Sequence, residues 1–103
     1  MYCGYNKYMD DEIELEWDEA KRQKTLKERG LDFSLAALVL SDPDMVQFID
    51  NRKEDKEIRY IAYGMVYGEV LKLCYTWRGK KIRVISIHKI HKKERGKYYG
   101  KND

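Results

Sequence analysis

The alternation of apolar and polar positions divides the chain into short strands and helices. From Ile13 to Trp17, apolar side chains alternate with glutamates, which is the period of a half-buried strand. Asp18 is then placed to cap a helix from about Glu19 to Arg29, and Gly30 supplies its stop. Because this helix has few apolar residues, most of its surface is expected to face solvent or a partner.

A second and more apolar helix is predicted from Phe33 to Leu40, with Asp32 as its cap. The turn-forming residues 41–44 follow it and lead into a short strand from Met45 to Ile49. Residues 50–56 are expected to form a charged loop. The apolar helix is therefore predicted to lie in the core.

Three further strands are predicted over residues 57–66, 70–77 and 81–88, joined by short loops that contain glycine. Links this short require antiparallel pairing. In the first of these strands, Arg59, Ile61 and Tyr63 share one face. A last helix is predicted from Lys92 to Tyr99. This order of elements predicts an α+β domain with an antiparallel meander and helices packed on one face.

Composition limits the class of protein. A chain of 103 residues with 38% charged and 13% aromatic residues is expected to form one soluble domain, over residues 12–100, after a poorly ordered extension over residues 1–11. No apolar stretch is long enough for a membrane helix, and the first residues do not resemble a signal peptide, so we expect a cytoplasmic protein. Cys3 and Cys74 lack neighbouring ligands at zinc spacing, and a reducing compartment disfavours a disulfide between them. Cys74 is expected in the core and Cys3 in the tail.

Charge is divided unevenly along the chain. Residues 1–77 carry 11 Lys and Arg against 16 Asp and Glu, whereas residues 78–101 carry 10 basic residues against Glu94 alone. A segment this basic is expected of a surface that meets phosphate or an acidic protein, although a solvated charged face explains many such runs. Histidines and tyrosines lie among the basic residues and can stack on bases.

Motifs of common enzyme classes are missing from the sequence. It has no GxSxG serine, no glycine-rich phosphate loop and no HExxH. Its acidic, basic and imidazole side chains suit RNA cleavage without a metal, in which a base activates the 2′ hydroxyl, cations hold the phosphate and an acid protonates the leaving oxygen.

Individual residues fit these roles and have plainer alternatives. Arg59 and Arg83 can hold phosphate oxygens from adjoining parts of a sheet, or can form surface ion pairs with Glu57 or Glu69. His88 is a candidate acid or base, or a solvated side chain at a strand end. Glu57 and Glu94 can act as a base or orient an arginine. Tyr75 and Trp77 are expected in the core.

Several short motifs, in their order and spacing, resemble the BrnT family of toxins. The resemblance covers about Leu15 to Tyr99 and rests on Glu16-Trp17-Asp18, Lys21, Gly30, Phe33, Ala36, Asp42-Pro43, Glu57-x-Arg59-Tyr60, Gly64, Tyr75-Thr76-x-Arg78, Arg83-Val84-Ile85-Ser86 and Glu94-Arg95. It implies a ribonuclease toxin of a type II toxin-antitoxin pair with a RelE-like fold and no metal. It also implies a BrnA-like antitoxin that binds the toxin and represses their shared operon. Carried over by position, the implied functional residues are Lys21, Glu57, Arg59, Arg83, Glu94 and Arg95.

The chain departs from the family pattern in two regions. Thr25 and Arg29 stand where the family usually has Asn and His, and Ser86-Ile87-His88-Lys89 stands where a Ser-Ala-Arg-Lys string is common, so His88 takes the place of an arginine. His88 can replace that arginine as a proton carrier or can weaken phosphate binding.

The predicted site has two parts. The catalytic candidates are Glu57, Arg59, Arg83 and His88, and the RNA-binding candidates are Lys21, Lys89, Lys92, Lys93, Glu94 and Arg95, with no metal and no cofactor. The expected partners are RNA and the antitoxin, in a hetero-oligomer that meets operator DNA only through the antitoxin. Two alternatives stay open: an inactive module that binds RNA or antitoxin, and a domain whose basic surface docks an acidic protein.

Overall fold

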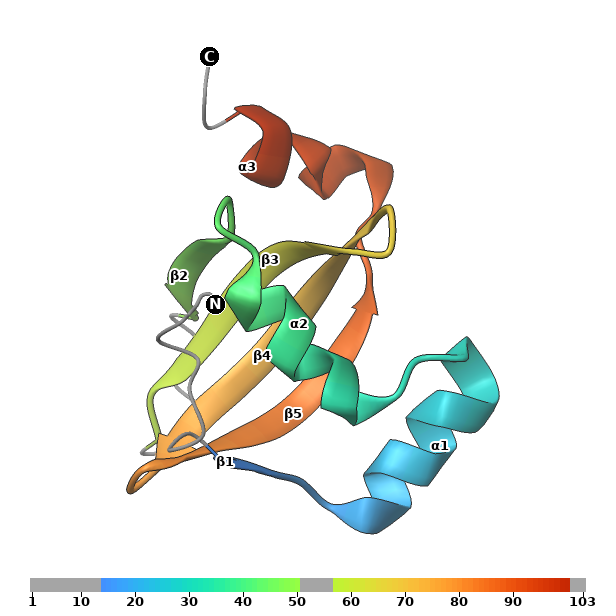
Figure 1. Cartoon of the computed structure of the whole chain (residues 1–103), viewed down its shortest axis with the longest axis vertical. Coiled ribbons are helices and arrows are strands. Elements are labelled where there is room, and N and C mark those ends of the chain that lie inside the picture. The colour runs from blue at the N-terminus through green and yellow to red at the C-terminus, as the bar shows by residue number, and fades with distance from the viewer. Residues whose placement is uncertain (1–13, 51–56, 101–103) are drawn as a thin grey trace.

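The computed structural model describes residues 14–50 and 57–100, and its centre is a five-stranded sheet in the order β1-β5-β4-β3-β2 (Figure 1). The strands are β1 (Glu14–Glu16), β2 (Val46–Asp50), β3 (Arg59–Val66), β4 (Glu69–Arg78) and β5 (Lys81–Lys89). The helices are α1 (Glu19–Arg29), α2 (Ala36–Ser41) and α3 (Arg95–Tyr99), and the last two begin with the 3-10 turns η1 (Phe33–Leu35) and η2 (Lys92–Glu94). The predicted α+β class and element order are confirmed.

Strands β2 to β5 form the predicted antiparallel meander. Strand β1 adds to the far edge of β5 in parallel, with Glu16 opposite Arg83. Parallel neighbours need a long connection, and here that connection contains most of the chain. Local patterning therefore predicts that β1 exists but not where it pairs.

The first helix has the predicted bounds because both of its ends are capped. The Asp18 side chain accepts a hydrogen bond from the Lys21 amide at 3.1 Å, and Gly30 ends the helix in the left-handed region at φ 71°. No residue of α1 is buried, as its polar composition predicts. It lies at the β5 side of the sheet, where the Arg29 guanidinium donates to the Ile87 carbonyl at 3.1 Å.

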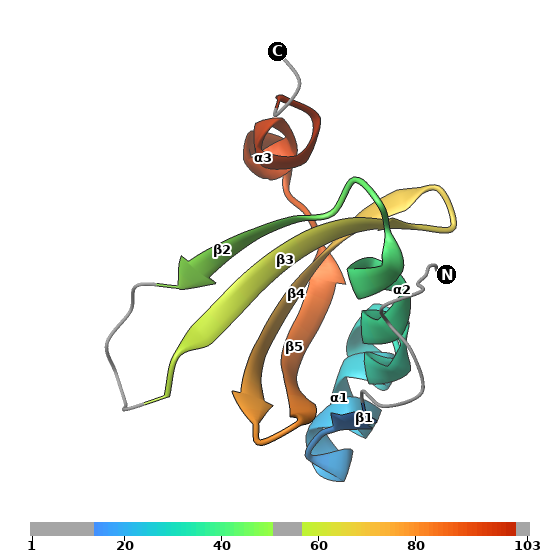
Figure 2. The same cartoon turned by 60° about the vertical axis from the view of Figure 1, so that its left-hand side comes forward.

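Helix α2 covers one face of the sheet (Figure 2). Its buried Val39 lies against Gly64 of β3, and the core beneath it contains Phe33, Leu73 and Ile87. The strand faces are those that the sequence predicts, since Ala62 points into this core and Tyr63 points to the opposite face. Burial of these apolar side chains is the main force that holds α2 on the sheet.

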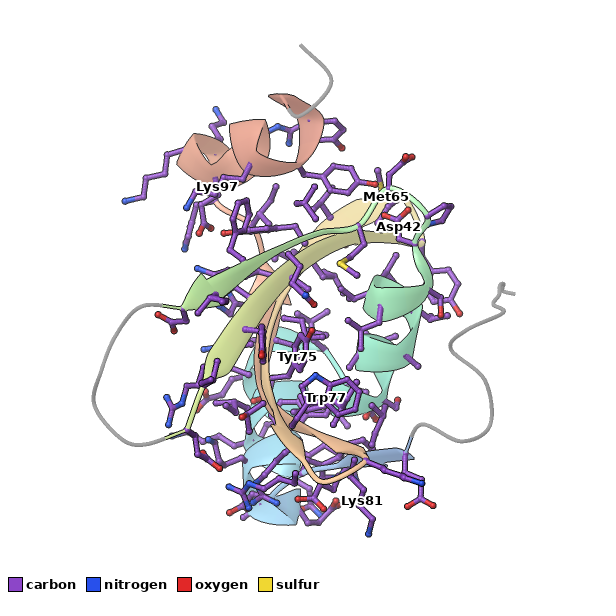
Figure 3. The ribbon with its side chains drawn as sticks, turned by 90° about the vertical axis from the view of Figure 1, so that its left-hand side faces the viewer. Asp42, Met65, Tyr75, Trp77, Lys81 and Lys97 are labelled. Carbon is purple, nitrogen blue, oxygen red and sulfur yellow. The ribbon has the colours of Figure 1, made fainter. Side chains whose placement is uncertain are left out.

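The C-terminal helix packs on the second face, at one end of the sheet (Figure 2), so the prediction that the helices share one face is wrong for α3. Tyr98 is buried with Tyr63 and Val70 in a cluster separate from the main core. Its hydroxyl donates to Asp42 at 2.6 Å, and the same carboxylate oxygen accepts from the Met65 amide at 2.7 Å (Figure 3). Asp42 therefore ties the α2–β2 turn to both β3 and α3.

Two expectations about the core have different outcomes. Cys74 and Tyr75 are buried, as predicted, whereas Trp77 is 43% exposed and its prediction as a core residue is wrong. Trp77 pairs with the buried Ile82 but stands next to the last residue of β4, close to the β4–β5 hairpin (Figure 3). Residues 1–11, Cys3 and most of the predicted loop over 50–56 lie outside the described residues. In residues 14–50 and 57–100, no helix is long and apolar enough to cross a membrane.

Candidate functional site

A row of polar residues crosses the sheet face opposite α2. Residues in register on the five strands are Glu16, Arg83, Thr76, Arg59 and Asp50, which we call the arginine row. Paired residues project to the same face of a sheet, so these side chains share it. Arg59 and Arg83 flank Thr76 and stand two strand spacings apart, about 10 Å. The structure thus brings together two of the four predicted catalytic residues.

Ion pairs hold the cations at this end of the sheet. Arg83 binds Glu16 at 3.1 Å, and Arg78, two residues beyond Thr76, binds Glu57 at 2.7 Å. The predicted alternative that Arg83 pairs with Glu57 or Glu69 is wrong, because β1 supplies a closer carboxylate. Glu57 precedes β3, and its role stays a prediction: the ion pair with Arg78 is compatible with the alternative in which it orients an arginine.

A second group of polar side chains surrounds Glu94 at the other end of the same face. The Glu94 carboxylate accepts three hydrogen bonds: from the Lys72 ammonium at 2.9 Å, from the Tyr63 hydroxyl at 3.2 Å and from the His91 amide at 3.2 Å. Burial raises the pKa of Glu94, but the bonds from Lys72 and the His91 amide outweigh it and hold the pKa at about 2. Burial and the neighbouring carboxylate raise the pKa of Tyr63 to about 12, so its hydroxyl keeps its proton.

His88 belongs to this second group, since it is the cross-strand partner of Lys72. Its ring centroid is 6.4 Å from that of His91. Burial lowers the pKa of His88, and the positive charges of Arg29 and Lys72 lower it further. The imidazole is therefore mostly neutral at pH 7 and able to accept a proton.

The two groups do not form one cluster. Thr76 and Lys72 are four residues apart on β4, which corresponds to about 13 Å. The paired residues Cys74 and Ser86 lie between them. His88 is thus on the same face as Arg59 and Arg83 but about 13 Å away along β4 and β5. We call the surface of these two strands between the arginine row and His88 the strip.

The predicted RNA-binding residues lie in three places. Lys92, Lys93 and Arg95 are exposed on η2 and α3, and the Arg95 guanidinium lies 5.2 Å from the centre of the Tyr99 ring. Lys89 ends β5 and binds Glu69 at 3.3 Å. Lys21 is exposed on α1, at the far side of the sheet. Glu94, by contrast, is turned inward to Lys72.

The fold brings acidic residues of the first part of the chain next to basic residues of the last part, so their charges partly cancel. Acidic residues from the first 77 positions bind basic residues of the later segment in four pairs: Arg78–Glu57, Lys81–Glu14, Arg83–Glu16 and Lys89–Glu69. The exposed basic surface that remains is concentrated on η2 and α3.

Sequence reasoning missed two participants, Glu16 and Lys72. Glu16 joins the arginine row only because β1 pairs with β5, and no local pattern indicates that pairing. Lys72 had a detectable signal, since it is a single charge in the otherwise apolar run 70–75. Within the described residues, no three His, Cys, Asp or Glu side chains are grouped so that they could hold a metal ion.

Comparison with known protein families assigns the chain to one of them. Residues 17–94 match the family model of the ribonuclease toxin BrnT of type II toxin-antitoxin systems. The chain belongs to the BrnT family. The matched region runs from the residue before the α1 cap through β5 to Glu94, so it includes every member of the arginine row except Glu16. A BrnT toxin of a type II system has an antitoxin as its partner. None of the curated proteins matches the chain.

Proposed function

We propose that this BrnT-family chain is a metal-independent endoribonuclease of the cytoplasm, that it cuts RNA on the open face of the sheet, and that a BrnA-like antitoxin neutralises it. The observation that carries this proposal is the arginine row. Two guanidinium groups flank a threonine hydroxyl on one face, and carboxylates close both ends of the row. Guanidinium groups bind phosphate oxygens in pairs, so this face suits a phosphodiester.

The reaction that fits these side chains is an internal transfer at phosphorus. The 2′ oxygen attacks the adjacent phosphorus and loses its proton to a base, the bond from phosphorus to the 5′ oxygen breaks, and that oxygen takes up a proton. The products are a 2′,3′-cyclic phosphate and a 5′ hydroxyl. Arg59 and Arg83 stabilise the charge that develops on phosphorus, and Glu57, beside Arg59 at the start of β3, is the nearest predicted base.

The rest of the strip binds the neighbouring part of the RNA. His88, about 13 Å from the arginine row, is too far to share its phosphate and instead contacts the next nucleotide. Lys89, Lys92, Lys93 and Arg95 continue the path beyond β5, and Lys21 adds a cation from α1. Glu94 acts by positioning Lys72 rather than by touching RNA.

The test is cleavage of labelled RNA in EDTA by the wild type, Arg59→Ala and Arg83→Ala, with Lys24→Ala on exposed α1 as the matched control. We expect the two row variants to lose about 100-fold or more in rate, because each removes a stabilising cation, and the control to keep its rate. Product ends should be 2′,3′-cyclic phosphates. Full activity in both row variants, with unchanged melting temperatures, would reject this site.

A second candidate function is an inactive member of the family that holds RNA or antitoxin. It is favoured by one observation, namely that Arg83 and the predicted base Glu57 are each already engaged in an ion pair. Salt-sensitive RNA binding with no cleavage by the wild type would support it over the enzyme.

A further inference from the structure

Four large apolar side chains are exposed together at one corner of the sheet, where β2 and the start of β3 meet the end of β4. Phe48 is 45% exposed, Ile49 60%, Ile58 59% and Trp77 43%. They make up half of the large apolar side chains that the described residues expose. We call them the apolar corner.

Strand register shows that the corner is continuous. Ile49 pairs with Tyr60 of β3, and Tyr60 stacks on Tyr75 with ring centroids 5.4 Å apart. Ile58 precedes Arg59, whose partner Thr76 precedes Trp77, so Ile58 and Trp77 lie on adjacent strands. Phe48 projects to the other face and meets Tyr63 edge to face at 6.1 Å. The apolar surface therefore wraps around both faces of β2.

Strand β2 is also the last strand of the sheet. In the described part of the chain it pairs on one side only, with β3 over all five residues (Figure 2). The other edge of such a strand carries backbone donors and acceptors that another strand can pair with. An edge strand with apolar side chains exposed on both faces is a typical place for strand addition.

We propose that the apolar corner is the docking site of the antitoxin, and that an extended antitoxin segment adds to β2 as a sixth strand. The antitoxin is the protein partner that membership of a type II toxin family supplies. The segment should carry apolar side chains beside Phe48 and Ile49, which are exposed on the two faces of β2. This inference rests on the proposed function only for its consequence, which is that the bound segment blocks RNA.

The chemistry of the corner favours a peptide over RNA and over a second copy. Aliphatic Ile49 and Ile58 offer no ring for base stacking, and backbone edges pair with backbone. A second copy would pair only through the five residues of β2, whereas the family supplies an antitoxin as the protein partner. An apolar segment satisfies both the backbone edge of β2 and the exposed side chains beside it.

The position of the apolar corner explains how a bound antitoxin segment would block RNA. Asp50 ends β2 and is the last member of the arginine row, directly paired with Arg59. A strand added beside β2 would lie one strand spacing, about 5 Å, from Asp50. Arg59 is one strand spacing further, about 10 Å from the added strand, so a partner bound there can exclude RNA from this end of the row.

The test uses the complex of the full chain with its antitoxin. Binding is measured by calorimetry for the wild type, Ile49→Asp and Phe48→Asp, with Leu26→Asp as the matched control, because Leu26 is 41% exposed on α1. We expect each corner variant to weaken antitoxin binding about tenfold or more and the control to match the wild type. Hydrogen exchange should show new protection of the amides of residues 46–50 in the complex.

Other outcomes overturn the proposal. Unchanged affinity in both corner variants, or no protection of β2, would place the antitoxin elsewhere. A dimer of the chain alone that Ile49→Asp dissolves would assign the corner to a second copy, and weaker RNA binding by Phe48→Asp would assign it to RNA. Antitoxin binding is measured without RNA and is expected to survive in Arg83→Ala, so a failure here and a failure of the ribonuclease proposal are separate results.

Discussion

At the scale of single residues, Glu94 shows how a charge near the predicted site is used. The side chain is nearly buried, and three donors, on β3, on β4 and at the cap of η2, satisfy its oxygens. A buried carboxylate is stable only with such partners. Its acidity is thus a property of the fold, and it fixes Lys72 next to His88.

Replacing Glu94 with Gln should lower the free energy of unfolding by about 2 kcal/mol at pH 7, because Lys72 loses its buried counter-charge. The folded-state pKa of Glu94 is about 2, against a usual value of 4.5, so its contribution is complete above about pH 5 and is lost as the pH falls toward 2. Urea unfolding from pH 7 to pH 3 measures this. The difference from the wild type should shrink toward pH 3, and Glu14→Gln, at an exposed pair, should change little throughout. A difference that is constant with pH would contradict the assignment.

At the scale of elements, the contact between α2 and β3 fixes the distance between this helix and the sheet. Gly64 lies under Val39, and a Cβ atom there would be 2.5 Å from the Val39 carbonyl oxygen and 3.0 Å from its Cα. Both atoms belong to the helix backbone, which cannot move without lifting α2. Glycine is therefore required at position 64 by close approach.

Gly64→Ala should destabilise the protein by about 2 kcal/mol, because the added methyl group overpacks the helix–sheet contact. Gly96→Ala, in α3, is the control, since a Cβ atom at position 96 would have no neighbour within 4 Å outside its own helix turn and alanine favours helix. Thermal unfolding of both variants measures the effect. Equal melting temperatures for Gly64→Ala and the wild type would mean that α2 is not held at this distance.

At the scale of the whole molecule, the fold brings acidic residues of the first three quarters of the chain to basic residues of the last quarter. Glutamates on β1, on β4 and just before β3 compensate much of the basic segment, and the C-terminal η2 and α3 keep exposed cations. Exposed cations dominate the salt dependence of nucleic-acid binding.

The double variant Lys92→Ala/Lys93→Ala should therefore bind single-stranded RNA more weakly and with a smaller salt dependence. Each lost phosphate contact reduces the slope of log K against log salt by about 0.7, so the expected change is about 1.4. Fluorescence anisotropy over a range of salt concentrations measures the slope. Lys24→Ala on α1 is the control. An unchanged slope in the double variant would mean that the lysines of η2 do not contact RNA.

The sequence by itself determined the elements whose signals are local. Asp18 and Gly30 bound α1, alternation assigns the faces of β3, and short loops make β3, β4 and β5 antiparallel, because caps, side-chain period and loop length act over a few residues. Only the tertiary structure decided that β1 pairs with β5, that Glu16 binds Arg83 and that His88 lies apart from the arginines. It also exposed Trp77, which alternation assigns to the core. Each of these depends on which distant segments pack together, and that depends on burial and register across the whole sheet rather than on any local pattern.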